Sequence, residues 1–371
     1  MTKISSRRRR LPPLLIVVTI FALMGGLVAF FVGPLPIRFG LAPAAPAGLA
    51  ANDWQRETQD LPHPGVTRWR SQPDSDGTLA ELVCFDFASN PGLRLEIYDQ
   101  DEDDAKPFDN SVQFWERGVM DAAAHLNSTG RGEVVAAWNG LFFATEGKTM
   151  AHHVGPVVIN GKTRLSGLPR HRWTFGVRYD RETGKPRFLA LHQPPAAEMS
   201  RRFDFAADAA QCLVRNGKPL ALQPFPIPGA PPVKQPVAST PAEAGHIPIV
   251  DHMRTTRVSL GWTENSDRLY LLFVKEPDSE TASIYAHRYG IPLAGGWTVA
   301  DVQRFWLRRK VWGAINSDGG DLAQFYLRGK DGDTLYPPRW SRREMRLEPA
   351  PSQSPRGGSL MYFYVRDAHS R

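Results

Sequence analysis

The stretch Ala314-Ile315-Asn316-Ser317-Asp318-Gly319-Gly320-Asp321 follows an amphipathic helix predicted over 299–310 and completes a short apolar strand predicted over 311–315. Thr298 and Asp301 have the spacing of a capping box, which predicts where that helix begins. The strand leads into an aspartate on a Gly-Gly turn. A substrate can approach such a carboxylate closely, because glycines place no Cβ atoms beside it. An ordinary strand-ending turn fits the same residues, so both interpretations stay open at this point.

Short apolar runs bounded by turn residues extend from this stretch in both directions and predict a domain rich in strands. The predicted strands are 79–87, 93–98, 133–138, 154–159, 173–179, 187–191, 212–215, 220–222, 257–262, 268–274, 322–327 and 361–365. Asn-Gly pairs at 160–161 and 216–217 predict tight hairpins. Apolar residues at helical spacing after Asn110, a plausible N-cap, predict a second helix over 111–126. Because helices do not alternate regularly with strands, we expect an α+β fold with a mixed, largely antiparallel β-sheet and a few packed helices.

The positive charge of the chain is concentrated at one end. The formal net charge of the 371 residues is +7, and Lys3 with Arg7 to Arg10 supplies five positive charges without an acid, which leaves +2 for the rest. A nucleic-acid-binding protein would spread its basic excess over a binding face, so no nucleic-acid partner is expected. The basic residues instead precede an uncharged apolar segment over 14–32, whose nineteen residues are long enough to span a bilayer as a helix.

This apolar segment sets the expected domain organisation. The arginines before it favour a cytoplasmic N-terminus. A cleaved signal peptide is the alternative, but its apolar core would usually be shorter, so we favour an uncleaved single-pass anchor. The predicted parts are a basic cytoplasmic tail 1–13, a transmembrane signal anchor 14–32, an Ala/Pro-rich stalk 33–66, and a periplasmic or extracellular domain 67–371. Within the domain, eight prolines in the 26 residues 223–248 predict a long surface loop.

The cysteines and the acidic residues give weaker indications. Cys84 and Cys212 lie in apolar runs, which predicts two buried hydrophobic side chains; a single disulfide between them stays open. The acidic run 99–104 is predicted to be a solvated loop, with a calcium site as the alternative. The sequence requires no cofactor, and a divalent cation remains possible.

Three segments combine a strand with a polar residue beside a small one. Asn139-Gly140 follows the strand over 133–138, Arg257 begins the strand over 257–262, and Asp318 stands on the Gly-Gly turn. An amide, a guanidinium and a carboxylate from distant positions can converge at strand ends, where sheet enzymes often place their sites.

In this order the three segments resemble the phosphodiester glycosidase family, which typically carries Asn-Gly followed by aromatics, then Arg-Thr-Ala-Ile-Gly, then Leu-Asp-Gly-Gly-Gly-Ser. The matching residues here are Asn139-Gly140-Leu141-Phe142-Phe143, Arg257-Val258-Ser259-Leu260-Gly261 and Ser317-Asp318-Gly319-Gly320-Asp321-Leu322. The hairpin at 212–218 and the approach to the helix at 296–298 extend the resemblance over roughly residues 80–330.

The chain departs from the family pattern where a substrate hydroxyl contact would be expected. Asp321 and Leu322 replace the third glycine and the serine, Ser317 replaces the leucine, and Val258 replaces the threonine of Arg-Thr. These departures put the substrate in doubt, and loss of activity is the other outcome they allow.

The resemblance implies hydrolysis of a sugar-1-phosphodiester linkage, here in an envelope or exopolysaccharide glycan. Phosphate leaves the anomeric carbon readily, so one carboxylate carries most of the chemistry. We expect Asp318 to be the nucleophile or the base that activates water, and Arg257 to bind the phosphate through its guanidinium fork. The alternatives are a turn-capping aspartate and a surface salt bridge. Arg254 is the nearest competitor for the phosphate contact.

Further candidates fill supporting roles. The backbone N–H groups of Gly319 and Gly320 are expected to contact an anion. Asn139 is expected to bind sugar hydroxyls or to shape a turn. Asp321 is a candidate second catalytic carboxylate, and His252 a candidate proton donor to the leaving group or a simple loop histidine. A non-catalytic glycan-binding or polysaccharide-assembly protein on the same fold is the alternative function.

Overall fold

The computed structural model describes residues 54–57, 61–72, 74, 78–103, 107, 112–113, 117–146, 150–164, 173–222, 254–276, 295–320, 323–336 and 359–370. These residues belong to one unit that spans 45–371. The predicted anchor 14–32 and the proline-rich segment 223–248 lie outside them. Within the described ranges, no helix has the length and apolar character that crossing a bilayer requires.

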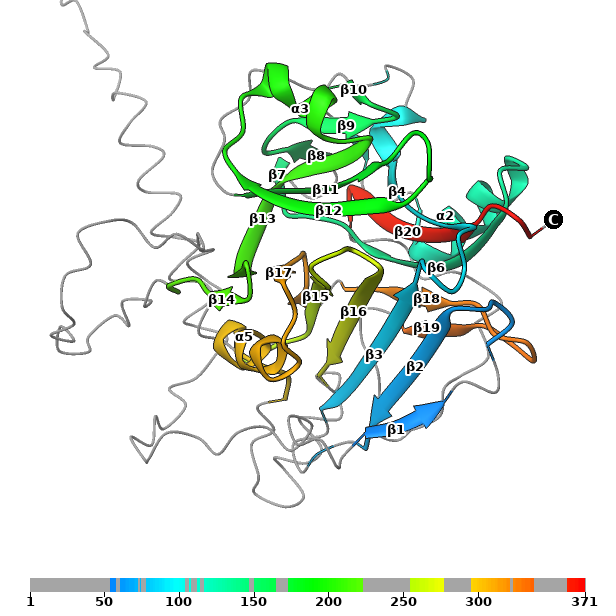
Figure 1. Ribbon diagram of the computed structural model, residues 1–371, viewed down its shortest axis with the longest axis vertical. Helices are drawn as coiled ribbons and strands as arrows, with labels where there is room; N and C mark the ends of the chain where they lie inside the picture. The colour runs from blue at the N-terminus through cyan, green and yellow to red at the C-terminus, as the bar shows by residue number, and fades with distance from the viewer. Residues whose placement is uncertain are drawn as a thin grey trace, which may run out of the picture. The chain divides into compact units, whose positions relative to one another are not determined.

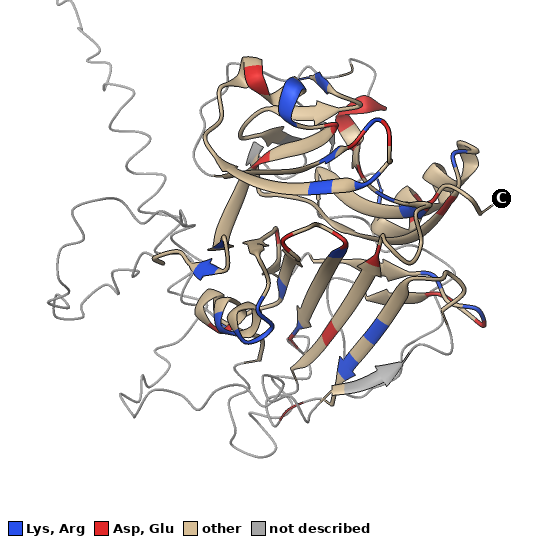
Figure 2. Ribbon diagram, viewed as in Figure 1, with Lys and Arg blue, Asp and Glu red and all other residues tan. Residues whose placement is uncertain are grey.

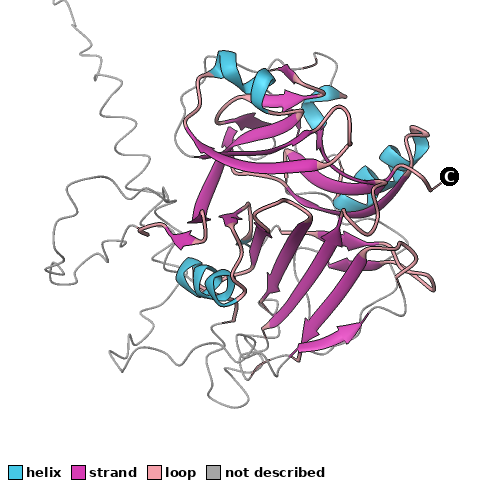
Figure 3. Ribbon diagram, viewed as in Figure 1, coloured by secondary structure: helices cyan, strands magenta, loops and turns pink. Residues whose placement is uncertain are grey.

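The described residues of this unit form three antiparallel sheets (Figure 1), and their regular structure is mostly strand (Figure 3). The largest sheet follows the order β1 (Trp54–Glu57), β2 (Val66–Ser71), β3 (Leu79–Asp86), β16 (Arg268–Lys275), β15 (Arg257–Trp262), β17 (Gly313–Asn316), β13 (Phe205–Arg215), β11 (Trp173–Tyr179) and β12 (Pro186–His192). The short strands β9 (Val157–Ile159), β10 (Lys162–Thr163) and β14 (Lys218–Pro219) join it off this path.

The other two sheets are smaller. The five-stranded sheet has the order β19 (Thr334–Tyr336), β18 (Phe325–Leu327), β6 (Glu133–Asn139), β20 (Met361–Asp367) and β4 (Leu93–Asp99). A three-stranded sheet contains β5 (Val112–Gln113), β8 (Met150–His153) and β7 (Phe143–Glu146). Among the described residues the helices are α2 (Val119–Ser128), α3 (Ala196–Arg202) and α5 (Val299–Arg308), with a 3₁₀ turn η3 at Gln100–Glu102.

The main core lies between the largest and the five-stranded sheet, because alternate residues of each strand face inward. Along β6, for example, Trp138 packs in this core while Ala137 faces the cluster around α2 on the outer side. Helix α5 covers the outer face of the largest sheet. Gly261 permits that contact, since a Cβ there would lie 2.8 Å from the Trp306 ring.

Most predicted elements are confirmed. Helix α5 starts at the predicted capping box, in which the Thr298 side chain accepts from the Asp301 N–H and the Asp301 carboxylate accepts from the Thr298 N–H. The hairpin turn at Asn160-Gly161 has φ values of 52° and 71°, as a type I′ turn requires. The described sheets contain antiparallel pairs throughout, so the antiparallel part of the expected fold class is confirmed, whereas the expected parallel component is not seen in the described strands.

Three expectations about elements were wrong. The helix predicted over 111–126 is preceded by strand β5, because Val112 pairs with Ala151 across the small sheet, and α2 begins only after Gly118. The strand predicted over 220–222 is not one, since β14 is limited to Lys218–Pro219. The stalk predicted over 33–66 contains β1, which pairs with β2 along its whole length.

Candidate functional site

The three predicted segments meet at one place. The chain that leaves β17 runs between the end of β6 in the five-stranded sheet and the start of β15 in the largest sheet. Three backbone hydrogen bonds hold it there: Asp318 N–H to Gly140 O at 3.0 Å, Ser317 N–H to Val258 O at 2.8 Å, and Gly320 N–H to Thr256 O at 2.8 Å. The Ser317 hydroxyl also donates to Gly140 O. Segments about 60 and 180 residues away along the chain therefore converge on the Asp318 turn.

The two glycines of the turn have different reasons to be glycine. A Cβ on Gly319 would lie 2.6 Å from Thr256 O and 3.2 Å from Arg257 Cα, so the turn presses directly on the β15 backbone. Gly320 has a φ of +75°, a left-handed conformation that other residues rarely adopt. Because the Gly320 N–H already donates to Thr256 O, this amide is engaged within the protein, which leaves the Gly319 N–H as the candidate anion contact of the turn.

Asp318 is partly exposed and lies within electrostatic reach of the five-stranded sheet. The pKa of Tyr362 in β20 is raised, first by burial and then by Tyr98, Asp121 and Asp318. Tyr362 stands opposite Asn139 in the β20–β6 register. The electrostatic influence of Asp318 thus extends to the strand pair that carries Asn139.

Arg257 is a buried residue and not a surface one. Only 2% of the residue is exposed, and its Nε donates to the Trp297 carbonyl at 2.8 Å. Arg254, the competing arginine, donates through its Nε to the neighbouring Gly296 carbonyl at 3.0 Å. Both arginines are therefore fixed by the segment that leads into α5, which orients the plane of each guanidinium.

Asn139 makes a structural contact that the sequence left open. Its side chain is fully buried, and its Oδ1 accepts from the Gln324 N–H at 2.9 Å. The Gln324 side chain in turn accepts from the Val119 N–H at the start of α2, at 2.8 Å. Asn139 thereby joins the end of β6 to the chain that follows the Asp318 turn.

A row of buried polar residues, not predicted as a site, crosses the largest sheet beside the turn. Ser259, Asn316 and Gln211 stand opposite one another on β15, β17 and β13. Asn316 Nδ2 donates to Gln211 Oε1 at 3.2 Å, whereas Asn316 Oδ1 is buried without a hydrogen-bond partner in the described part of the chain. Polar residues inside apolar strand runs, such as Ser259 between Val258 and Leu260, were the sequence signal that could have indicated this row.

A buried Asp–His pair lies two strands from Asn139. Asp99 Oδ2 is 2.9 Å from His153 Nε2, and neither side chain is more than 2% exposed. Asp99 stands opposite Met361, whose carbonyl accepts from Gly140 N–H at 2.9 Å. The acidic run 99–104 was predicted to be a solvated loop, which is wrong for its first residues, because Asp99 and Asp101 are buried and Asp99 caps η3.

Two predicted site residues lie beyond the part of the chain that the structure describes. Asp321 and His252 lie outside the described residues, so their placement stays a prediction. Among the residues that the structure does describe, there is no group of three or more His, Cys, Asp or Glu side chains arranged to hold a metal ion.

Comparison with known proteins gives a structural similarity without a sequence match. No protein-family model matches the chain, and no curated protein sequence does. The structure is similar to the zebrafish N-acetylglucosamine-1-phosphodiester α-N-acetylglucosaminidase catalytic domain, auto-inhibited by its pro-peptide, with a TM-score of 0.49 and 16% identity over 84% of this chain and 88% of that one.

Two further solved structures are similar. One is a hypothetical protein from Synechocystis, with a TM-score of 0.48 and 12% identity over 81% of this chain and 62% of that one. The other is a Burkholderia pseudomallei protein whose name describes it as exported, with a TM-score of 0.42 and 12% identity over 78% of this chain and 74% of that one. At these identities the similarities concern the fold and assign no residue a role.

Proposed function

We propose that the protein is a membrane-anchored, extracytoplasmic hydrolase that cleaves a sugar-1-phosphodiester linkage in an envelope or exopolysaccharide glycan. One observation carries the proposal: the Asp318 turn is hydrogen-bonded to both the Asn139-Gly140 strand end and the β15 segment that begins with Arg257. The family resemblance of these segments supplies the reaction class. The anchor over 14–32 supplies the location and belongs to the proposal.

The chemistry follows from the groups that the turn brings together. A phosphate leaving group needs little protonation, so a single carboxylate suffices as nucleophile or as base for water, and Asp318 takes this role. Arg257 binds the phosphate. Its Nε is held by the Trp297 carbonyl, which presents the Nη edge of the guanidinium in a fixed direction. The Gly319 N–H adds an anion contact, and Asn139 acts by holding the strand end in place.

Asp321 and His252 complete the proposed site as a second carboxylate and a proton donor. We expect both Asp321→Asn and His252→Gln to lower kcat more on substrates with poor leaving groups than on substrates with good ones. Proton donation matters only for a poor leaving group.

A second function has its own support. Asp321 and Leu322 stand where the family carries glycine and serine. The Gly320 N–H and the Asn139 amide oxygen are used in contacts within the protein. These observations favour a non-catalytic glycan-binding or polysaccharide-assembly protein on the same fold.

Turnover of synthetic sugar-1-phosphate alkyl esters by full-length protein separates the two. The hydrolase releases free sugar and an alkyl phosphate, and Asp318→Asn lowers kcat by about 10³-fold, roughly 4 kcal/mol of transition-state stabilisation. Asp121→Asn is the matched control, since Asp121 also influences Tyr362 but lies exposed on α2. Equal turnover by wild type and Asp318→Asn removes Asp318 from the mechanism; binding without turnover by wild type favours the second function.

A further inference from the structure

We infer that the protein has a second glycan-binding pocket, at the opposite end of β6 from Asn139. A pocket of about 700 Å³ opens there, within the size range of small-molecule sites. Its lining residues are Asn127, Gly130, Arg131, Gly132, Glu133, Arg328, Ala368 and Ser370. Because β6 runs from Glu133 to Asn139, six residue steps of about 3.3 Å separate the two sites by roughly 20 Å. The pocket is therefore distinct from the proposed catalytic turn.

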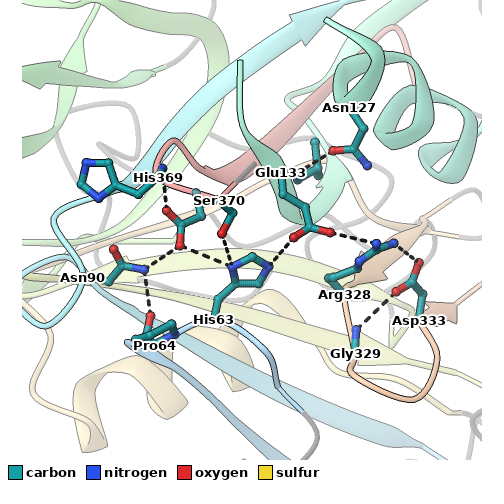
Figure 4. Close-up of polar contacts among 12 residues, drawn as sticks. His63, Pro64, Asn90, Asn127, Glu133, Arg328, Gly329, Asp333, His369 and Ser370 are labelled. Atoms are coloured by element: carbon teal, nitrogen blue, oxygen red, sulfur yellow. Dashed lines mark hydrogen bonds and ion pairs between the residues drawn. The ribbon is translucent and has the colours of Figure 1, made fainter. Parts of the chain in front are cut away.

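The charged side chains in the pocket wall form ion pairs, and Figure 4 shows those of Arg328. Arg328 Nη2 is 2.8 Å from Glu133 Oε1, and its Nη1 is 3.2 Å from Asp333 Oδ2. Arg131 Nη2 is 2.6 Å from Glu96 Oε2. The side chains of Glu133, Arg328 and Arg131 remain 31%, 37% and 44% exposed, so groups with fixed positions still face solvent.

A buried histidine lies behind Glu133. His63 Nε2 is 3.4 Å from Glu133 Oε2, and its Nδ1 is 3.3 Å from Asp367 Oδ2. Asp367 also accepts from Asn90 Nδ2 at 2.9 Å, and the Ser370 hydroxyl lies 3.5 Å from His63 Nδ1. Arg328 therefore pairs with one oxygen of Glu133, and the His63 ring lies beside the other (Figure 4). A ligand meets a pre-organised carboxylate and does not have to order it.

The charge balance of the wall favours a neutral ligand. Each guanidinium in the wall already has a carboxylate partner, so an anion would compete with Glu133, Asp333 and Glu96. A hydroxyl group both donates and accepts, and adjacent sugar hydroxyls can bridge a carboxylate and a guanidinium without breaking their pair. Figure 2 shows that positions of basic and acidic residues are interspersed along the described chain. The pocket thus suits uncharged sugar units.

The small lining residues leave room for a sugar ring. A Cβ placed on Gly130 would meet nothing within 4 Å, and Ala368 is exposed. The open space beside Gly130 and the roughly 20 Å along β6 between the pocket and Asn139 fit an oligosaccharide better than a monosaccharide. If the proposed function holds, the pocket retains a polysaccharide whose phosphodiester is cleaved at the other end of the strand.

Glycan-array binding by fluorescent full-length protein, in a detergent without a sugar headgroup, tests the pocket. We expect binding to neutral oligosaccharides that falls at least tenfold in Ala368→Trp, which fills the pocket without removing a charge. The matched control is Ala197→Trp, at an exposed alanine of α3, which retains binding. Glu133→Gln keeps the side-chain shape and also weakens binding, which covers the case in which Ala368→Trp does not fold.

Three outcomes overturn the inference: no neutral glycan binds, only acidic glycans bind, or Ala368→Trp and Glu133→Gln bind as wild type does. The result is independent of the catalytic proposal. Asp318→Asn retains array binding, whereas Ala368→Trp retains turnover of a small sugar-1-phosphate ester.

Discussion

The contact between the Gly319 turn and the β15 backbone gives a quantitative prediction. In Gly319→Ala the new Cβ would lie 2.6 Å from Thr256 O and 3.2 Å from Arg257 Cα. Both neighbours are backbone atoms, so no side chain can rotate away and the turn itself must shift. Overpacking of this kind costs about 1–3 kcal/mol. The shift also moves Arg257, so the KM for a sugar-1-phosphodiester rises together with the loss of stability.

The neighbouring glycine provides the control. Gly320 has a φ of +75°, but a Cβ there meets nothing within 4 Å. Gly320→Ala therefore costs only the left-handed strain of about 1–2 kcal/mol, partly offset by about 0.4–1 kcal/mol of unfolded-state entropy. For a domain of roughly 300 residues the unfolding entropy is about 0.6 kcal/mol per kelvin, so about 2 kcal/mol, the middle of the range for Gly319→Ala, corresponds to about 3 °C. By thermal unfolding, Gly319→Ala melts below Gly320→Ala; the opposite order would refute the close contact.

Three further predictions concern stability and reactivity. Thr298→Ala removes the capping-box hydroxyl of α5 and lowers stability by about 1 kcal/mol, measured as a fall in Tm; an unchanged Tm would contradict the cap. Burial would raise the pKa of Asp367, but hydrogen bonds, first from Asn90, hold it below its ordinary value of 3.8. The ionised Asp367 carboxylate therefore stabilises the fold above pH 3.8, and this stabilisation is lost as the pH falls through the lowered pKa of the folded state. In thermal melts at a series of pH values, Asp367→Asn should reduce the fall of Tm at acid pH. An unchanged acid dependence of Tm would contradict the hydrogen bonds to Asp367. Cys84 and Cys212 are free thiols, and burial raises the pKa of each to about 12. Iodoacetamide is therefore expected to label neither thiol at pH 8 until denaturant is added. Rapid labelling of the native protein would show that the thiols are accessible.

Local signals in the sequence were sufficient for most of the fold. The strands at 173–179 and 257–262 and the start of α5 could be predicted, because alternation, Asn-Gly turns and the capping box act over a few residues. Strand β5 could not, because the helical spacing after Asn110 was overridden by pairing of Val112 with Ala151, about 40 residues away. A distant partner leaves no local trace in one sequence.

The same distinction applies to the candidate site. Asp318, Arg257 and Asn139 could be selected because each is polar beside a strand and a small residue, and the structure brings their segments together. Their individual contacts could not be predicted, since the carbonyl that holds Arg257 and the amide that binds Asn139 come from segments far along the chain. The pocket at Glu133 had no sequence signal at all, because its wall is assembled from three separate segments, 127–133, Arg328 and 368–370.

The position of a bound sugar-1-phosphodiester in crystals of the Asp318→Asn protein tests the central claim most directly. The phosphate is expected within hydrogen-bond distance of the Arg257 guanidinium, with the anomeric carbon facing the side chain at position 318. A ligand found only elsewhere, for example in the pocket beside Glu133 and Arg328, with none at the turn, would contradict the proposed active site.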